Sequence, residues 1–287
     1  MPHAGYRRPG HFVGDLGLVT EVLSPGKAVV RMQVSPEVTA GDGGVRAGVL
    51  ATMVDVVGGM AALRMVGSDW LATADLTLQV VQPLTGPVVE ARGTVVRKGH
   101  TTLVLEAAVY DAAPGVPATG ADRAPTPGAW ATMTFAILPG RRRRSTVDVP
   151  NGLPDRWRVD GRGFDRPIID ALSITVTDAA GGVVSMPVDE YLHNSVGAVQ
   201  GGAMAVLGEA AGAAALGAAG GGPEPVVRDL CLTYLALGRV GPMVSRASVL
   251  QPPDGSSGGR ALVELFDNGA EDRLTTLIQV GAERAGV

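Results

Sequence analysis

The chain repeats its own pattern at an offset of 154 residues, and this internal repeat limits the folds open to it. Asp55 and Glu209 each stand alone in an apolar, glycine-containing stretch, and 154 residues separate them. The same offset, without a gap, pairs identical residues over a long span: Val29 with Val183, Val30 with Val184, Met32 with Met186, Val34 with Val188, Gly43 with Gly197, Val45 with Val199, Gly48 with Gly202, Asp75 with Asp229 and Leu76 with Leu230. Agreement at so many spaced positions predicts a duplicated structural unit.

Both copies of the repeat show the same order of predicted elements. A hairpin of Val-rich runs is predicted at 17–34 and again at 170–188. A helix follows at 45–66, where apolar residues recur at helical spacing, and at 199–222, where Ala predominates. Four strands complete each copy, at 70–83, 88–99, 101–112 and 128–139 in the first and at 223–237, 241–252, 259–268 and 272–283 in the second. One helix must therefore serve a whole antiparallel sheet in each copy.

The repeat and the length of 287 residues predict two domains, at 1–140 and 168–287, joined by a connection at 141–167. A composition of 46% apolar and 18% charged residues provides for two cores. The stretch 112–128 is rich in Pro, Gly and Ala and is predicted to be a loop that is ordered at its ends. The connection opens with four arginines at 141–144, which we interpret as a solvated linker, with a phosphate-binding patch as the alternative.

Composition also excludes several classes of protein. A net charge of −4 and a pI near 5.6 argue against nucleic acid as a partner. The single cysteine, Cys231, excludes an internal disulfide, and no pair of the four histidines has metal-ligand spacing, so we expect neither metal nor cofactor. The helix predicted at 199–222 is about long enough to span a membrane, but its glycines and its acid argue against a membrane protein. The N-terminus lacks the apolar core of a signal peptide, which predicts a cytoplasmic protein.

The residues around the two acids resemble the PaaI-like acyl-CoA thioesterases, a family with the hotdog fold, in which a curved antiparallel sheet wraps one long helix. The pattern of that family is roughly N-x-x-G-x-x-H-G-G, followed by an acid nine residues after the His. The second copy matches at Asn194, Gly197, Gly201 and Gly202, with Gln200 in place of the His and Glu209 as the acid. The following strand of the first copy, in TADLTLQVVQPLTGP, is also similar to the family.

The first copy departs further from the family pattern. It keeps Gly43 and the acid Asp55, but Arg46 stands in place of the His and Ala40 in place of the Asn. Ala47 and Gly48 replace the two glycines. The resemblance nevertheless covers nearly the whole chain except the connection and the termini. It implies an α+β protein of two tandem hotdog domains that hydrolyses acyl-CoA.

Helix geometry requires that each site be built from both copies. The start of each helix, at Ala47 or Gly201, lies eight residues before the acid, which is roughly 12 Å at about 1.5 Å per residue, too far for both to contact one thioester. Each acid is therefore expected to work with the N-terminus of the other helix, packed antiparallel to its own. Free N–H groups at that terminus polarise the carbonyl, and the carboxylate acts as general base or as nucleophile.

Two composite sites follow, and they are not equivalent. The first joins Asp55 to Asn194, Gln200 and the Gly201 N–H, with Thr73 placed to orient water, and it has every part that the resemblance implies. The second joins Glu209 to Arg46 and the Ala47 N–H, with Ala40 and Val227 where the first has Asn194 and Thr73, and we expect it to be impaired. For Arg46 two further roles stay open, a salt bridge to Glu209 or a contact with a CoA phosphate.

Other functions are weaker alternatives. The chief rival is a non-catalytic acyl-CoA binding or sensing protein, since the departures at Arg46, Ala47 and Gln200 would also fit lost turnover. The G-x-S-x-G match at 255–259 lies in a turn with no helix after it. Hydratases of the same fold use D-x-x-x-x-H, and Asp189 and His193 are one residue too close for that motif. Exposed sheet edges predict association of the chain into dimers or trimers.

Overall fold

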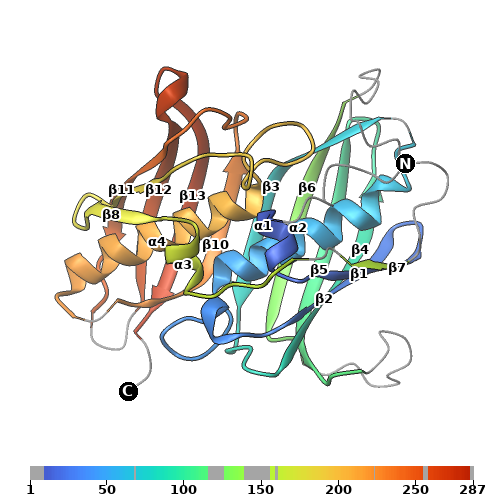
Figure 1. The fold of residues 1–287 in the computed structure, drawn as a ribbon, viewed down its shortest axis with the longest axis horizontal. Coiled ribbons are helices and arrows are strands. Elements are labelled where there is room, and N and C mark those ends of the chain that lie inside the picture. The colour runs from blue at the N-terminus through green and yellow to red at the C-terminus, as the bar shows by residue number, and fades with distance from the viewer. Residues whose placement is uncertain are drawn as a thin grey trace.

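A continuous antiparallel sheet of thirteen strands, with two long helices across one face, forms the centre of the protein (Figure 1). The computed structural model describes residues 10–67, 69–115, 126–138, 156–158, 161–222, 224–254 and 258–284. The strands of the first copy, with one strand of the connection, are β1 (Val19–Ser24), β2 (Lys27–Gln33), β3 (Trp70–Val80), β4 (Val88–Lys98), β5 (Thr102–Ala112), β6 (Ala129–Leu138) and β7 (Arg156–Arg158). Those of the second copy are β8 (Thr175–Asp178), β9 (Val183–Met186), β10 (Val226–Tyr234), β11 (Met243–Gln251), β12 (Gly259–Asp267) and β13 (Arg273–Glu283).

The two copies meet at the middle of the sheet, where β3 pairs with β10. The strand order is β7-β1-β2-β4-β5-β6-β3-β10-β13-β12-β11-β9-β8. In the central pair Thr77 lies opposite Cys231, and these two are equivalent positions of the repeat. A local two-fold axis therefore passes between them. Both central strands also carry an irregularity at the same place, between Thr73 and Asp75 in β3 and between Val227 and Asp229 in β10.

The helices α2 (Ala47–Leu63) and α4 (Gly201–Gly220) pack against each other where their N-terminal halves overlap. A Cβ atom on Gly48 would lie 2.6 Å from Val206 Cα, and one on Gly202 would lie 2.6 Å from Thr52 Cβ. Since Gly48 precedes Thr52 while Gly202 precedes Val206, the helices run antiparallel. Glycine at these two positions permits the close approach, and its helix-weakening effect is offset by burial of both helices.

Four short elements connect the long strands and helices. They are α1 (Phe12–Asp15), η1 (Pro36–Val38), α3 (Ile168–Ala171) and η2 (Asn268–Ala270). In Figure 1, α1 lies near the meeting point of α2 and α4. It is tied to the second copy because Phe12 N–H donates to Tyr191 O at 3.1 Å and the Tyr191 hydroxyl donates to Asp15 at 3.0 Å. The N-terminal segment of the first copy is thus fastened to the second.

The predicted order of hairpin, helix and four strands is present in both copies. Two details differ from the prediction. The connection contains β7, which pairs with β1 and extends the sheet of the first copy, and the second hairpin is preceded by the single turn α3. The arginines at 141–144, most of the loop at 112–128 and part of the G-x-S-x-G match lie outside the described residues.

α4 is the one helix of the described ranges that is long and apolar enough to cross a membrane, and 78% of its apolar window is buried inside the protein. Its apolar surface is therefore that of a core helix, covered by α2 and by the strands of the second copy.

Candidate active site

Asp55 lies on α2 and is held by side chains from both copies of the repeat. The Thr73 hydroxyl on β3 donates to Asp55 Oδ1 at 2.7 Å. The Gln200 side chain, from the residue that caps α4, also forms a hydrogen bond to the carboxylate. Burial raises the pKa of Asp55, and the hydrogen bonds from Thr73 and Gln200 oppose this rise. A partly buried carboxylate with two donors and a raised pKa is suited to accept a proton.

Gln200 links Asp55 to the start of α4. Its Oε1 accepts the Gly202 N–H at 3.3 Å, so its Nε2 is the end that donates to Asp55. Gln200 is 3% exposed, so its amide is buried together with these two partners. The preceding amide, the Gly201 N–H, is paired with no acceptor among the described residues. An unpaired N–H at a helix start is a donor for developing negative charge.

Asn194 shapes the loop before α4. Its Oδ1 accepts the N–H groups of Val196 at 3.0 Å and Ala198 at 3.1 Å. Arg239 closes the same loop by donating from Nη1 to Val196 O and Gly197 O. The carbonyl oxygen of Asn194 is thus committed to the loop, and its side-chain NH₂ is the group left for the role that we expected in polarising a carbonyl.

Glu209 lies in a different environment at the start of α2. Its Oε2 accepts the Gly48 N–H at 2.9 Å, and its Oε1 pairs with Arg46 Nη1 at 3.2 Å. The carboxylate is 2% exposed. Burial raises the pKa of Glu209, while the Arg46 charge and the Gly48 N–H oppose the rise. Of the roles open to Arg46, the salt bridge to Glu209 is the one present in the structure.

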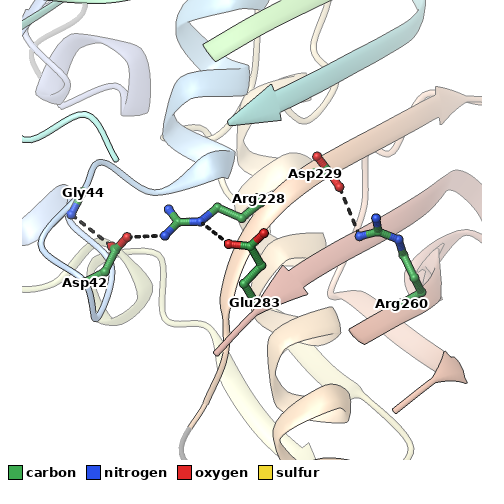
Figure 2. Close-up of polar contacts among 6 residues, drawn as sticks. All are labelled: Asp42, Gly44, Arg228, Asp229, Arg260 and Glu283. Atoms are coloured by element: carbon green, nitrogen blue, oxygen red, sulfur yellow. Dashed lines mark hydrogen bonds and ion pairs between the residues drawn. The ribbon is translucent and has the colours of Figure 1, made fainter. Parts of the chain in front are cut away.

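The loop before α2 is held by charges from the second copy (Figure 2). Asp42 Oδ1 accepts the Gly44 N–H at 3.1 Å, and its Oδ2 pairs with Arg228 Nη2 on β10 at 2.7 Å. Arg228 also contacts Glu283 on β13 at 3.4 Å. Figure 2 shows the Arg228 side chain lying between the two carboxylates. This arrangement has no counterpart at the other loop, where Val196 stands at the position equivalent to Asp42.

Tyr234, the last residue of β10, lies beside the Asp55 site. The sequence analysis did not predict a role for it. Its hydroxyl donates to Gly201 O at 3.1 Å. Burial raises the pKa of Tyr234 well above its usual value, and the nearby charge of Asp55 raises it further. The repeat contained a signal, because Tyr234 is equivalent to Val80 and so breaks the apolar pattern on one strand only.

The structure thus places the predicted residues in two unlike groups. Asp55, Thr73, Gln200 and Gly201 gather around one helix start. Glu209 and Arg46 gather around the other, where the N–H that Glu209 accepts is that of Gly48 and not the expected one of Ala47. In the first group the acid is held by side chains and no described backbone N–H pairs with it; in the second the acid itself takes a helix-terminal N–H. Within the described ranges, no three His, Cys, Asp or Glu side chains are arranged to hold a metal ion.

Comparison with known proteins adds independent support for the fold. Residues 42–118 match the model of the thioesterase superfamily. A protein of Saccharolobus solfataricus named "Putative esterase" is 31% identical over 90 residues, 31% of this chain and 64% of that protein. Another "Putative esterase", from Halobacterium salinarum, is 33% identical over 129 residues, 43% of this chain and 82% of its own length. The chain thus spans slightly less than two thirds of the first relative.

Both copies together match a solved structure. The crystal structure of a "putative thioesterase" from Novosphingobium aromaticivorans superposes with a TM-score of 0.60 at 15% identity, covering 93% of this chain and 98% of that one. This likeness shows the fold and confirms the predicted pair of tandem hotdog units in an α+β protein. The chain therefore belongs to the thioesterase superfamily and carries its hotdog fold twice, joined through β3 and β10 into one sheet.

Proposed function

We propose that the protein is an acyl-CoA thioesterase with one working site, built around Asp55. The observation that carries the proposal is the contrast between the two acids. Asp55 is held by Thr73 and Gln200 at the start of α4, whereas Glu209 is ion-paired with Arg46 and accepts the Gly48 N–H. In the described part of the chain the Asp55 carboxylate has no ion pair and can act as a base, whereas the Glu209 carboxylate is neutralised internally by Arg46 and the Gly48 N–H.

The Gly201 N–H supplies the electrophilic half of the site. A thioester carbonyl oxygen accepting this N–H gains negative charge as the carbonyl carbon becomes tetrahedral. The helix dipole of α4 and the N–H stabilise that charge together. The side-chain NH₂ of Asn194, whose Oδ1 is held by the preceding loop, would serve as a second donor. Removal of one such donor in acyl-transfer enzymes typically costs about 10²–10³-fold in rate.

Asp55 supplies the nucleophilic half by one of two routes. As a general base it takes a proton from water, the hydroxide oxygen bonds to the carbonyl carbon, the C–S bond breaks and the thiolate leaves with that proton. As a nucleophile, its oxygen bonds to the carbonyl carbon and expels the thiolate, and water then hydrolyses the mixed anhydride. Thr73, which donates to Asp55 Oδ1, is positioned to orient the water in either route.

The test compares alanine substitutions of the two acids. Asp55→Ala is expected to abolish thiol release from a panel of acyl-CoAs at saturation, a loss of about 10²–10⁴-fold typical for a general base. Glu209→Ala is expected to keep most of the turnover per folded molecule. Glu209→Gln serves as the matched control, because it keeps the volume of the side chain beside Arg46.

Three outcomes would contradict the proposal. Equal losses from Asp55→Ala and Glu209→Ala would contradict a single working site. A larger loss from Glu209→Ala would reverse the assignment. Binding of acyl-CoA by the wild-type protein without thiol release would instead favour the non-catalytic binding protein.

A further inference from the structure

The start of α4 and the end of β10 differ from the equivalent positions in α2 and β3. One side chain is smaller and the other is larger. At α4 the pair is Gly201 with Tyr234, and at α2 the equivalent pair is Ala47 with Val80. A Cβ atom on Gly201 would lie 3.1 Å from the Tyr234 hydroxyl and 3.3 Å from its Cζ. The phenol therefore covers the face of the helix start where Ala47 carries a methyl group. Only glycine leaves full room for the tyrosine ring at this place.

Side chains hold both ends of the first peptide unit of α4. The Tyr234 hydroxyl donates to Gly201 O, and Gln200 Oε1 accepts the N–H of Gly202, which belongs to the same peptide unit. The pair Gly201-Gly202 has more backbone freedom than any other sequence at a helix start, and terminal turns open readily. The two contacts restrict that freedom at the point where the Gly201 N–H must face a substrate.

Tyr234 and Thr73 stand on the two central strands of the sheet. Thr73 on β3 holds Asp55, and Tyr234 on β10 holds the start of α4. β3 and β10 are paired antiparallel, with Thr233 opposite Asp75. The acid and the helix start are therefore both attached to one strand pair, which sets their separation. The charge of Asp55 also acts on Tyr234, consistent with a place beside the same site.

We propose that Tyr234 is a positioning residue of the Asp55 site, which holds the Gly201-Gly202 start of α4 so that the Gly201 N–H meets the thioester carbonyl. The proposal rests on the proposed function for its effect on turnover. It predicts that loss of the hydroxyl loosens the helix start and lowers kcat, because the N–H acts mainly on the charge that develops in the transition state.

The first experiment compares two half-buried tyrosines whose hydroxyls each donate one hydrogen bond, to different partners. Tyr234→Phe is expected to lower kcat about tenfold with less than a twofold change in KM, a smaller loss than removal of an oxyanion donor. Tyr191→Phe is the matched control, since it also removes a hydroxyl that donates one hydrogen bond, to Asp15 at 3.0 Å and to neither Asp55 nor α4. Equal kcat values for the two variants would overturn the proposal.

The second experiment separates this proposal from the proposed function. Hydrogen exchange, followed by mass spectrometry on peptides that cover the first turn of α4, needs no substrate. Exchange is expected to be faster in Tyr234→Phe and unchanged in Tyr191→Phe. Unchanged exchange in both would overturn the role of Tyr234 whatever the activity. Absence of thiol release by the wild type, with faster exchange in Tyr234→Phe, would count against the proposed function alone.

The third experiment replaces Gly201 and Tyr234 by the residues at the equivalent positions of the first copy. Gly201→Ala alone is expected to lower Tm, because the added methyl group meets the phenol. The double variant Gly201→Ala/Tyr234→Val recreates the pair Ala47 with Val80 and is expected to recover Tm while kcat stays low. Recovery of kcat together with Tm would show that only packing matters and would overturn the proposal.

Discussion

At the scale of single residues, one methylene group separates the two acids of the repeat. Glu209 is long enough to reach the Gly48 N–H at 2.9 Å and is neutralised there by Arg46. Asp55 is shorter and is held by Thr73 and Gln200, while the Gly202 N–H, equivalent to that of Gly48, is taken by Gln200. With Gln200 at the position of Arg46, Asp55 has no cationic partner among the described residues. At the same repeat position, Glu209 thus holds the start of α2, and Asp55 is the candidate base.

Lengthening Asp55 is expected to convert its site toward the Glu209 arrangement. In Asp55→Glu the longer side chain is expected to reach the Gly202 N–H, as Glu209 reaches that of Gly48, and to displace Gln200 beside the Gly201 N–H proposed for the substrate. We expect kcat/KM to fall about hundredfold, similar to the loss of an oxyanion donor. Glu209→Asp is the matched change at the other site and is expected to lower Tm without lowering kcat. Near wild-type turnover in Asp55→Glu would contradict this account of the site.

The pH dependence of activity follows from the raised pKa of Asp55. The ionised carboxylate is the active form, so activity is present above its pKa and is lost as the pH falls through it. Because burial raises that pKa, the acid limb of kcat/KM is expected to have its midpoint above about 3.9, the ordinary value for Asp. The measurement is kcat/KM for thiol release from one acyl-CoA, from about pH 4 to 8. The midpoint of the acid limb is expected to be unchanged in Glu209→Gln. A midpoint that moves in that variant would assign the limb to Glu209 and contradict the prediction.

At the scale of elements, the crossing of α2 and α4 sets which acid meets which helix start. The contact is made through glycine in both helices, and Gly48 faces the backbone of Val206. A backbone neighbour cannot rotate away as a side chain can. The crossing is therefore specified by the absence of a side chain at Gly48 and Gly202, which explains glycine at these two positions.

Alanine substitutions at two glycines of α2 test this crossing. In Gly48→Ala the new Cβ would lie 2.6 Å from Val206 Cα, so we expect a loss of about 1–3 kcal/mol from overpacking. Gly59 lies on the same helix with no atom within 4 Å of an added Cβ, so Gly59→Ala is expected to gain about 0.4–1 kcal/mol. The free energy of unfolding in urea measures both. A stable Gly48→Ala variant would mean that the helices do not cross at this point.

At the scale of the whole molecule, the two copies are held together by the sheet, the helices and a group of charges. β3 and β10 make the sheet continuous, α1 contacts the second copy, and Arg228 on β10 pairs with Asp42 before α2. The outermost strands are β7 and β8, and all four residues of β8 are exposed. Open edges of this kind agree with the predicted association into dimers or trimers, which stays a prediction.

The charges between the copies can be tested with the two arginines of Figure 2. Arg228 is 16% exposed and its partner Asp42 11%, so Arg228→Ala leaves a largely buried carboxylate and is expected to cost about 1–3 kcal/mol. Arg260 is 55% exposed and its partner Asp229 39%, so Arg260→Ala is expected to cost at most about 1 kcal/mol. Chemical unfolding measures both. Equal losses would show that the Arg228 contact contributes little to holding the copies together.

The duplication, the element order and the two lone acids follow from the sequence alone, because repeats, apolar periodicity and helix rise are local or one-dimensional properties. Helix rise was even enough to predict that each acid serves the other helix. The contacts of Glu209 with Gly48, of Tyr234 with Gly201 and of Arg228 with Asp42 were decided only by the tertiary structure. An offset of 154 says which positions are equivalent, but equivalence does not say which side chains touch. Those contacts depend on how the antiparallel helix crossing and the β3–β10 pairing bring together residues far apart in the chain, and on side-chain lengths that differ between the copies.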